Sequence, residues 1–191
     1  MHLIMKDLSI INCKRCKALP VKPDDFDKVI VNGRYLQMGA INNIKSIKLY
    51  LLISYVSTGR FFYDFQMETW HRNDLKHILL KDSTDEKFIR FLNDKGILVV
   101  ECCFCPLHRF YKHKISYDHI PETVTLCFRR HNLHLLMINK DAPIITLFDR
   151  PRILDNEVPE ISSRIIRNFS FHKMERANKR FVKMVNKLTD N

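Results

Sequence analysis

The sequence predicts a single α/β domain over residues 1–191, with three α/β/α layers around a mostly parallel sheet of about four strands. Short apolar runs occur at 49–54, 97–101 and 143–148, as expected of parallel strands that are buried on both faces. Two helical patterns separate the first two runs, and a strand–helix–helix–strand order implies a crossover connection and parallel pairing. Because 46% of the residues are hydrophobic, the chain can build a sizeable core.

The region before residue 55 is predicted to contain one helix and two strands. Apolar residues recur at helical spacing in His2–Ile11. Val29–Val31 resembles a short strand and is followed by the turn signal Asn32-Gly33. The apolar run at 49–54 supplies the next strand.

Two helices are expected between this strand and the one at 97–101. The first covers 68–80, and the second opens with the capping box Ser83-Thr84-Asp85-Glu86 and is stopped by Gly96. We expect 97–101 to be a central strand. Its carboxyl end is where open α/β sheets place their chemistry.

The remainder of the chain is predicted to add two helices and one strand. A helix is expected over 123–139, and the last strand at 143–148, with irregular structure from Asp149. The final helix has an apolar face at i, i+3, i+4 and i+7, formed by Phe181, Met184, Val185 and Leu188. Its basic residues fall largely elsewhere on the wheel and include Arg176, Lys179, Arg180, Lys183 and Lys187. Such a face is either only solvated or directed toward DNA.

The charge balance favours a polyanionic partner. The chain has 32 Lys and Arg against 21 Asp and Glu, a net charge of +11, and nucleic acid is the commonest partner of so basic a protein. The alternative is a merely basic surface. With only four glycines, no G-x-G-x-x-G or Walker loop can be drawn, which argues against nucleotide-cofactor folds. No apolar run approaches the roughly 20 residues of a membrane span and no signal peptide is evident, so we expect a cytoplasmic protein without a membrane partner.

Two segments carry candidate nucleic-acid contacts. Arg60 stands between Gly59 and an aromatic cluster just after a predicted strand, which suits base stacking or phosphate contact. For any one of these rings, however, we favour a place in the core. Arg109, Lys112 and Lys114 belong to a basic loop bounded by prolines, which contacts a phosphate backbone or is simply solvated.

Six cysteines in a protein expected to be intracellular indicate metal binding rather than disulfides. Cys13 and Cys16 form a C-x-x-C pair, and Cys105 and Cys127 follow at the end of a strand and the start of a helix. Four thiolates suit either tetrahedral zinc or a [4Fe–4S] cluster, and spacing alone does not choose between them. The neighbouring Cys102 and Cys103 are explained as small core residues.

This layout resembles the iron–sulfur uracil-DNA glycosylases over most of the chain up to residue 148. The family's A-C-x-x-C-x-L is similar to Asn12–Leu19, its strand ending in N-x-V-K-C-x-P-P is similar to Gly96–Pro106, and its P-x-[IV]-[IV]-x-L-G is similar to Pro143–Phe148. The resemblance implies a uracil-DNA glycosylase-like fold, DNA binding in repair, and a structural [4Fe–4S] cluster. Its ligands would be Cys13, Cys16, Cys105 and Cys127.

The family's motifs that carry the chemistry are poorly matched. Gly59-Arg60-Phe61-Phe62 is similar to G-R-P-F, which implies that Phe62 stacks on an extruded base. The acid of G-E-x-P-G has no counterpart, the asparagine that reads uracil falls at Glu101, and H-P-S has only a loose match at His172. The candidates for catalysis are Asp64, Glu101 and His172.

Three hypotheses follow for function. The preferred one is a cluster protein with the glycosylase fold that binds DNA or joins a protein complex without base excision. The second is an active glycosylase with altered residues. Such an enzyme must still hold an extruded base and stabilise the developing anion. The third is a zinc-stabilised structural module.

Overall fold

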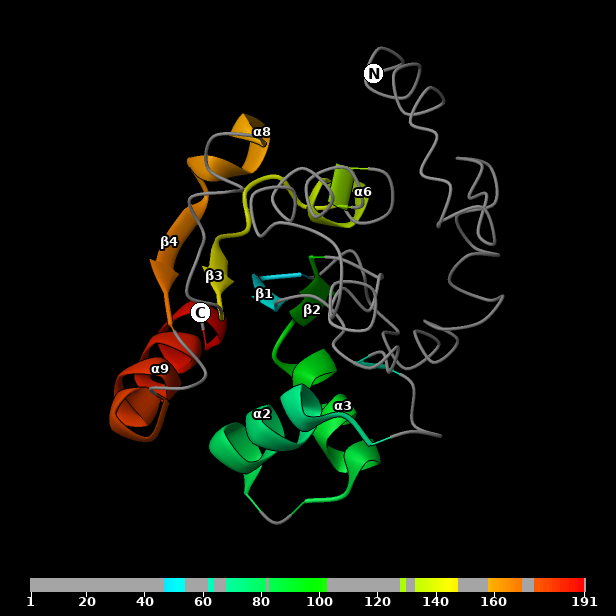
Figure 1. The fold of residues 1–191 in the computed structure, drawn as a ribbon, viewed down its shortest axis with the longest axis vertical. Coiled ribbons are helices and arrows are strands. Elements are labelled where there is room, and N and C mark those ends of the chain that lie inside the picture. Colours follow the sequence, from blue (N-terminus) through cyan, green and yellow to red (C-terminus); the bar gives the residue numbers. More distant parts are fainter. Residues whose placement is uncertain are drawn as a thin grey trace, which may run out of the picture.

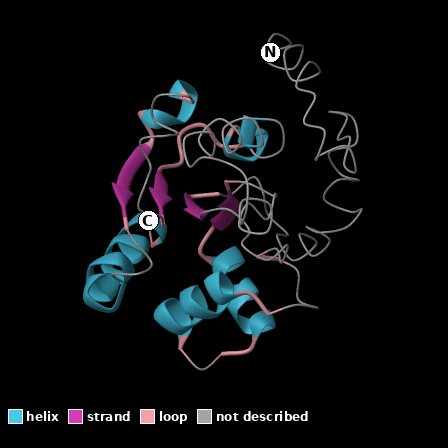
Figure 2. Ribbon diagram, viewed as in Figure 1, coloured by secondary structure: helices cyan, strands magenta, loops and turns pink. Residues whose placement is uncertain are grey.

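The computed structural model describes residues 47–53, 62–63, 68–81, 83–102, 128–129, 133–147, 158–169 and 174–190. The helix expected at 2–11 and the strand expected at 29–31 lie outside these ranges. Figure 1 shows the arrangement of the elements, and Figure 2 shows the helices gathered around the strands.

In the part of the chain that the structure describes, four strands form one sheet in the order β2-β1-β3-β4. Their bounds are β1 (Leu49–Ile53), β2 (Ile97–Glu101), β3 (Ile144–Thr146) and β4 (Ile165–Asn168). Each neighbouring pair is parallel, with Leu51 beside Val99 and also beside Ile145. The predicted α/β class, the parallel crossover and the strand at 97–101 are therefore confirmed. The strands predicted at 49–54 and 143–148 are confirmed within 49–53 and 144–146.

Strands β1, β2 and β3 are buried, and they are apolar along almost their whole length. Every residue of β1 is 0% exposed, and β2 and β3 are buried throughout. A strand covered on both faces cannot alternate polar and apolar residues, which explains the continuous runs in the sequence. This sheet forms the centre of the hydrophobic core.

Strand β2 lies at the edge of the described sheet, so the expectation of a central strand was wrong, and β1 is central instead. The reason lies in Tyr63, whose hydroxyl accepts a hydrogen bond from the backbone N–H of Val99 at 3.0 Å. That N–H belongs to the side of β2 that faces away from β1. A side chain therefore covers this edge as a neighbouring strand would, and β2 has the apolar sequence of an inner strand.

Residues 158–168 contain a helical turn and a strand, so the expectation that 143–148 is the last strand was wrong. Helix α8 (Pro159–Ser162) leads into β4, which pairs with β3. The register shifts between Ile144 and Ile145, which leaves Ile166 as the extra residue of a bulge. Because β4 is mostly exposed, it lacks the apolar run that marked the other strands.

The described residues between β1 and β2 include two helices, as predicted. They are α2 (Trp70–Leu80) and α3 (Asp85–Asp94). The Thr69 hydroxyl caps α2 by accepting from the N–H of Arg72 at 3.2 Å. Thr84, and not Ser83, caps α3 by accepting from the N–H of Lys87 at 3.3 Å. The predicted capping box is therefore displaced by one residue, and Gly96 ends this region with a φ of 66°.

A loop after the short helix α6 (Leu133–Leu136) is held by Arg164. Its guanidinium donates to the carbonyls of Leu136, Asn139 and Ala142 at 2.7 to 3.1 Å and lies over the ring of Tyr50. In a continuing helix these carbonyls would accept from backbone N–H groups, but here they accept from Arg164. The helix predicted to reach residue 139 therefore ends at Leu136, although the described residues 128–129 are also helical.

The last helix, α9 (Met174–Thr189), packs against β1 and α2. Phe181 and Val185 are fully buried, and Met184 and Leu188 pack against the core, which confirms the predicted apolar face. In Figure 1, α2, α3 and α9 lie together on one side of the strands, and α6 and α8 lie on the other. Among the described helices, none has the length and apolar character needed to span a bilayer.

Candidate nucleic-acid interface

Glu101 ends β2 at the carboxyl edge of the sheet, where its side chain is 2% exposed. Its Oε1 accepts a hydrogen bond from the backbone N–H of Phe62 at 3.1 Å. A buried carboxylate needs such donors, because burial without them costs far more than the hydrogen bond returns. In this arrangement Glu101 fastens the chain at residue 62 to the end of β2.

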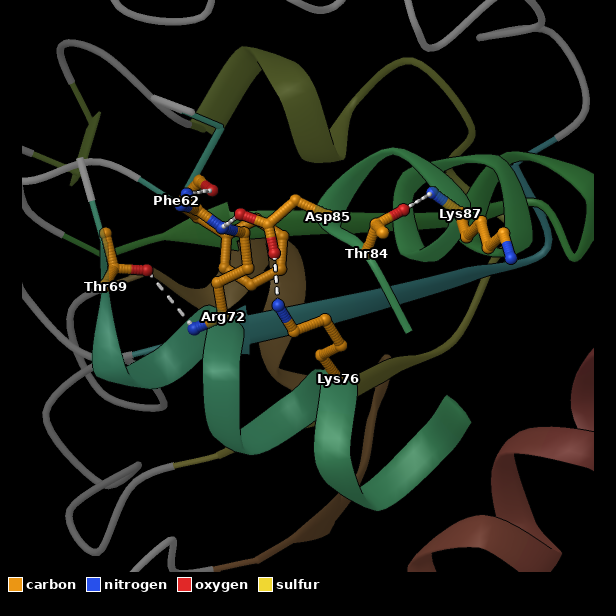
Figure 3. Close-up of polar contacts among 7 residues, drawn as sticks. All are labelled: Phe62, Thr69, Arg72, Lys76, Thr84, Asp85 and Lys87. Carbon is orange, nitrogen blue, oxygen red and sulfur yellow. Dashed lines mark hydrogen bonds and ion pairs between the residues drawn. The ribbon is translucent and has the colours of Figure 1, made fainter. Parts of the chain in front are cut away.

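Arg72 holds the other side of the same residue. Its Nη1 donates to the carbonyl oxygen of Phe62 at 2.7 Å, and its Nε donates to Asp85 Oδ2 at 2.8 Å (Figure 3). Lys76 binds the second oxygen of Asp85 at 2.5 Å. The Arg72 side chain is 1% exposed, so its charge is balanced inside the fold by a carboxylate from α3. We call Glu101, Phe62, Arg72 and Asp85 the carboxyl-edge clamp.

Tyr63 completes the attachment of this segment. Its ring lies 5.0 Å from that of Phe62, in an edge-to-face arrangement. Burial raises the pKa of the Tyr63 phenol; the hydrogen bond from Val99 N–H opposes that rise, and the charge of Glu101 adds to it. The hydroxyl therefore stays neutral at physiological pH and serves as a structural hydrogen-bonding group.

The clamp can hold the backbone, but its aromatic ring is not presented to a ligand. Phe62 is 1% exposed, and its ring packs against Tyr63 and also against Phe88 at 6.3 Å. A nucleobase could stack on this ring only after these neighbours had moved. The sequence allowed two interpretations of Phe62, a stacking ring or a core residue, and this geometry is that of a core residue.

A second polar pair lies at the carboxyl ends of β3 and β4, where the Thr146 hydroxyl donates to the Asn168 side-chain oxygen. The chain leaves β1 toward β2 and leaves β3 toward β4, so the connections diverge between β1 and β3. Open α/β sheets bind ligands at such a switch point, outside the carboxyl ends of the strands. Thr146 is fully buried, whereas Asn168 is exposed, which makes Asn168 the accessible member of the pair.

The clearest charged surface in the described part of the chain is one side of α9. Lys179, Arg180, Lys183 and Lys187 are all exposed. At 3.6 residues per turn they fall within an arc of about 100°. No acidic residue occurs between Lys179 and Lys187. We call these four side chains the basic arc; their predicted exposure is confirmed.

Most of the residues proposed from the sequence lie outside the described ranges. These are the metal candidates Cys13, Cys16, Cys105 and Cys127, the catalytic candidates Asp64 and His172, and the basic candidates Arg60, Arg109, Lys112 and Lys114. Within the described ranges no group of three metal-binding side chains occurs. Cys102 is described and buried in the core, as proposed, whereas Cys103 is not described.

Two prominent residues were not singled out from the sequence. Arg72 lies on the same side of α2 as Leu75 and Leu79, and a charged residue at an apolar position is a usable signal of a buried ion pair. Trp70 lies in the helix predicted over 68–80, and it is 43% exposed. No periodicity rule distinguishes an exposed tryptophan at the start of a helix from a buried one.

Comparisons of the chain with protein-family models, with curated proteins and with solved structures found no match.

Proposed function

We propose that this protein binds nucleic acid, DNA above all, through the basic arc of α9, and that it does so without excising bases. The observation that carries the proposal is the clustering of four exposed cations on one side of a helix whose opposite side is buried in the core. Lys179 and Lys187 are separated by eight residues, or about 12 Å of helix. A row of cations of that length can follow a phosphate backbone, and phosphate contacts supply most non-specific affinity for nucleic acid.

The firm attachment of α9 supports this role. Phe181 and Val185 anchor the helix in the core, and at its carboxyl end Lys48 donates to the carbonyl of Thr189 at 3.0 Å. Asp190, the acid nearest to the basic arc in sequence after the helix, forms an ion pair with Lys95. The positive side chains are therefore displayed on a rigid element, with this neighbouring negative charge engaged elsewhere.

A uracil-DNA glycosylase-like ancestry, with its three-layer arrangement, fits the parallel sheet and the order of the cysteines. The four cysteines 13, 16, 105 and 127 would supply the thiolates for a structural [4Fe–4S] cluster, with zinc as the alternative. Cys105 follows the buried Cys102 by three residues, just beyond the carboxyl end of β2. Such a centre would tie the first part of the chain to this edge of the sheet.

Two residues that the glycosylase resemblance places at the base-binding site argue against base excision. Glu101 accepts from a backbone N–H, and Phe62 is enclosed by other aromatic rings. Both are used to maintain the fold. A base-excising site needs a positioned acid or base and an accessible stacking ring, so we propose a binding protein or a subunit of a repair complex.

A binding assay with a charge-matched control tests the proposal. Lys183→Glu reverses one charge in the basic arc, and Lys140→Glu reverses an exposed lysine in the loop before β3. Fluorescence anisotropy with labelled DNA should show weaker binding for the first variant and near-normal binding for the second. Equal affinity in both variants and in the wild type would contradict a role for α9. A parallel assay for release of uracil distinguishes binding from excision.

The metal centre is tested separately. Iron and zinc should be measured in protein purified without oxygen, for the wild type and for Cys105→Ala, Cys127→Ala and Cys102→Ala. We expect the first two variants to lose metal and thermal stability, and the third to keep its metal. Unchanged metal content in Cys105→Ala and Cys127→Ala would remove both cysteines from the proposed ligand set.

A further inference from the structure

Trp70 is the largest exposed apolar side chain in the described part of the chain. It is the first residue of α2, it is 43% exposed, and it is the only tryptophan in the sequence. Its ring stacks on that of His71, with centroids 4.1 Å apart and planes inclined by 27°. His71 is 6% exposed, so the indole rests on a ring that is itself fixed in the structure.

An indole that is supported by a buried ring and partly open to solvent has the properties of a stacking platform. Exposed tryptophan is costly in water, because it leaves a large apolar surface hydrated. Nucleobases stack on aromatic side chains whatever their sequence, since every base has a π-face. The flat, supported geometry of Trp70 suits this contact better than the enclosed ring of Phe62.

Trp70 and the basic arc belong to two helices that pack against each other. These helices are α2 and α9, and α9 also packs against β1 (Figure 1). Each helix turns its apolar side toward the core that they share, with Leu75 of α2 and Phe181 of α9 fully buried. Their opposite sides, which carry Trp70 on one helix and the basic arc on the other, therefore both point outward from neighbouring elements.

We propose that Trp70 stacks on a base of a single-stranded nucleic acid whose phosphates lie along the basic arc; this deepens, and rests on, the proposed function. A stacking platform needs a base with an open face, and in a duplex the neighbouring base pairs cover both faces. The combination of an aromatic platform with a row of cations is the one by which sequence-tolerant proteins hold single strands. Because α2 and α9 contact each other, the platform and the row of cations lie on neighbouring helices.

The exposed side of α2 also carries Asp74 and His77, one and two turns after Trp70. Burial raises the pKa of Asp74, and the charge of His77 opposes the rise. A carboxylate beside the platform repels phosphate, so we expect the phosphates of the bound nucleic acid to lie on the basic arc and not beside Trp70. A protein ligand for this side is the competing possibility, and the experiment distinguishes it.

The single tryptophan makes the test direct, because intrinsic fluorescence reports Trp70 alone. Single-stranded DNA, duplex DNA of equal length and inorganic polyphosphate should be titrated into the full-length protein. We expect the single strand to quench the emission strongly and the duplex to quench it weakly. Polyphosphate should compete for the basic arc without quenching, because it has no bases.

Two substitutions sharpen the result. Trp70→Leu should weaken single-strand binding by about 5- to 150-fold, the effect of losing one stacked base, whereas Trp70→Phe should retain most of the affinity. Anisotropy with labelled DNA measures both. The quenching of the wild-type protein stands as evidence even if Trp70→Leu fails to fold.

The experiments distinguish a failure of base stacking on Trp70 from a failure of nucleic-acid binding by the basic arc. Binding of single strands with unchanged emission and normal affinity of Trp70→Leu would overturn the stacking role and leave the basic arc in place. Tighter binding of duplex than of single strand would overturn the single-strand assignment. Absence of binding to any nucleic acid would overturn the proposed function, and the side of α2 would then be a protein-docking surface.

Discussion

The carboxylate of Glu101 and the backbone of Phe62 are joined by a buried hydrogen bond of 3.1 Å between residues 39 positions apart. Because Arg72 donates to the carbonyl of the same residue, the peptide groups on both sides of Phe62 are fixed. One residue next to a sheet edge is thus held by an anion from β2 and a cation from α2. This clamp gives the first two predictions.

Replacement of Glu101 should destabilise the fold, and the loss should be smaller if the new side chain can still accept the hydrogen bond from Phe62. In Glu101→Ala the N–H of Phe62 loses its acceptor inside the protein, which costs about 1–3 kcal/mol. Glu101→Gln keeps a carbonyl oxygen and should lose less. Urea unfolding of both variants measures the difference. If alanine proved as stable as the wild type, the hydrogen bond would not be structural.

Replacement of Arg72 should have a larger effect. Arg72→Met removes the donor to Phe62 and leaves Asp85 with Lys76 alone, and breaking a buried ion pair by removing one partner costs about 3 kcal/mol or more. Lys76→Met is the control, since Lys76 is partly exposed and such pairs contribute about 0.2–1 kcal/mol. Similar losses in the two variants would show that burial of the guanidinium is not decisive.

The protein should lose stability in alkali through Tyr63. Its pKa is raised in the folded state, so its contribution is complete below the unfolded value near 10 and is lost as the pH rises toward the folded value. Tyr50, whose pKa burial also raises, adds to this effect. The free energy of unfolding should be compared at about pH 8 and about pH 11, on either side of the ordinary tyrosine value. Tyr63→Phe should show a smaller alkaline loss, and an undiminished loss in this variant would assign the effect to other groups.

Binding to single-stranded DNA should depend on salt in proportion to the cations of α9. Each phosphate contact contributes about 0.7 to the slope of log K against log salt concentration, so the double variant Lys183→Ala/Lys187→Ala should lower the slope by about 1.4. Anisotropy titrations over a range of salt concentrations provide the slope. Lys140→Ala serves as the control and should leave it unchanged. A double variant with the wild-type slope would place the phosphates elsewhere.

The fold was predictable where burial leaves a regular mark on the sequence. Strand β1 is apolar throughout, β2 is apolar up to Glu101, and the final helix repeats its apolar residues at i, i+3, i+4 and i+7, so each was recognised. Strand β4 was missed because it is an exposed, bulged edge in which apolar and polar residues do not alternate. The position of β2 was wrong because Tyr63, a single side chain, covers an edge that sequence patterns attribute to another strand.

The candidate site was less predictable, because its contacts are made between residues distant in sequence. Phe62 was proposed as a stacking ring from the resemblance to the family's G-R-P-F motif, and its burial depends on Tyr63 and Phe88. Glu101 was proposed for chemistry because it falls at the position of the family's uracil-reading asparagine, and its partner is a backbone group that no motif encodes. The basic arc was predicted correctly, since exposure opposite an apolar helix face follows directly from periodicity.

The packing of α9 against β1 joins parts of the chain that are synthesised at very different times. The hydrogen bond from Lys48 to Thr189 spans 141 positions, and Phe181 and Val185 complete a core whose central strand is made much earlier. A nascent chain therefore carries a central apolar strand long before the helix that covers it has been translated. Since contacts between distant residues also slow folding, we expect this core to close only after α9 has been synthesised and the nascent chain to depend on chaperones until then.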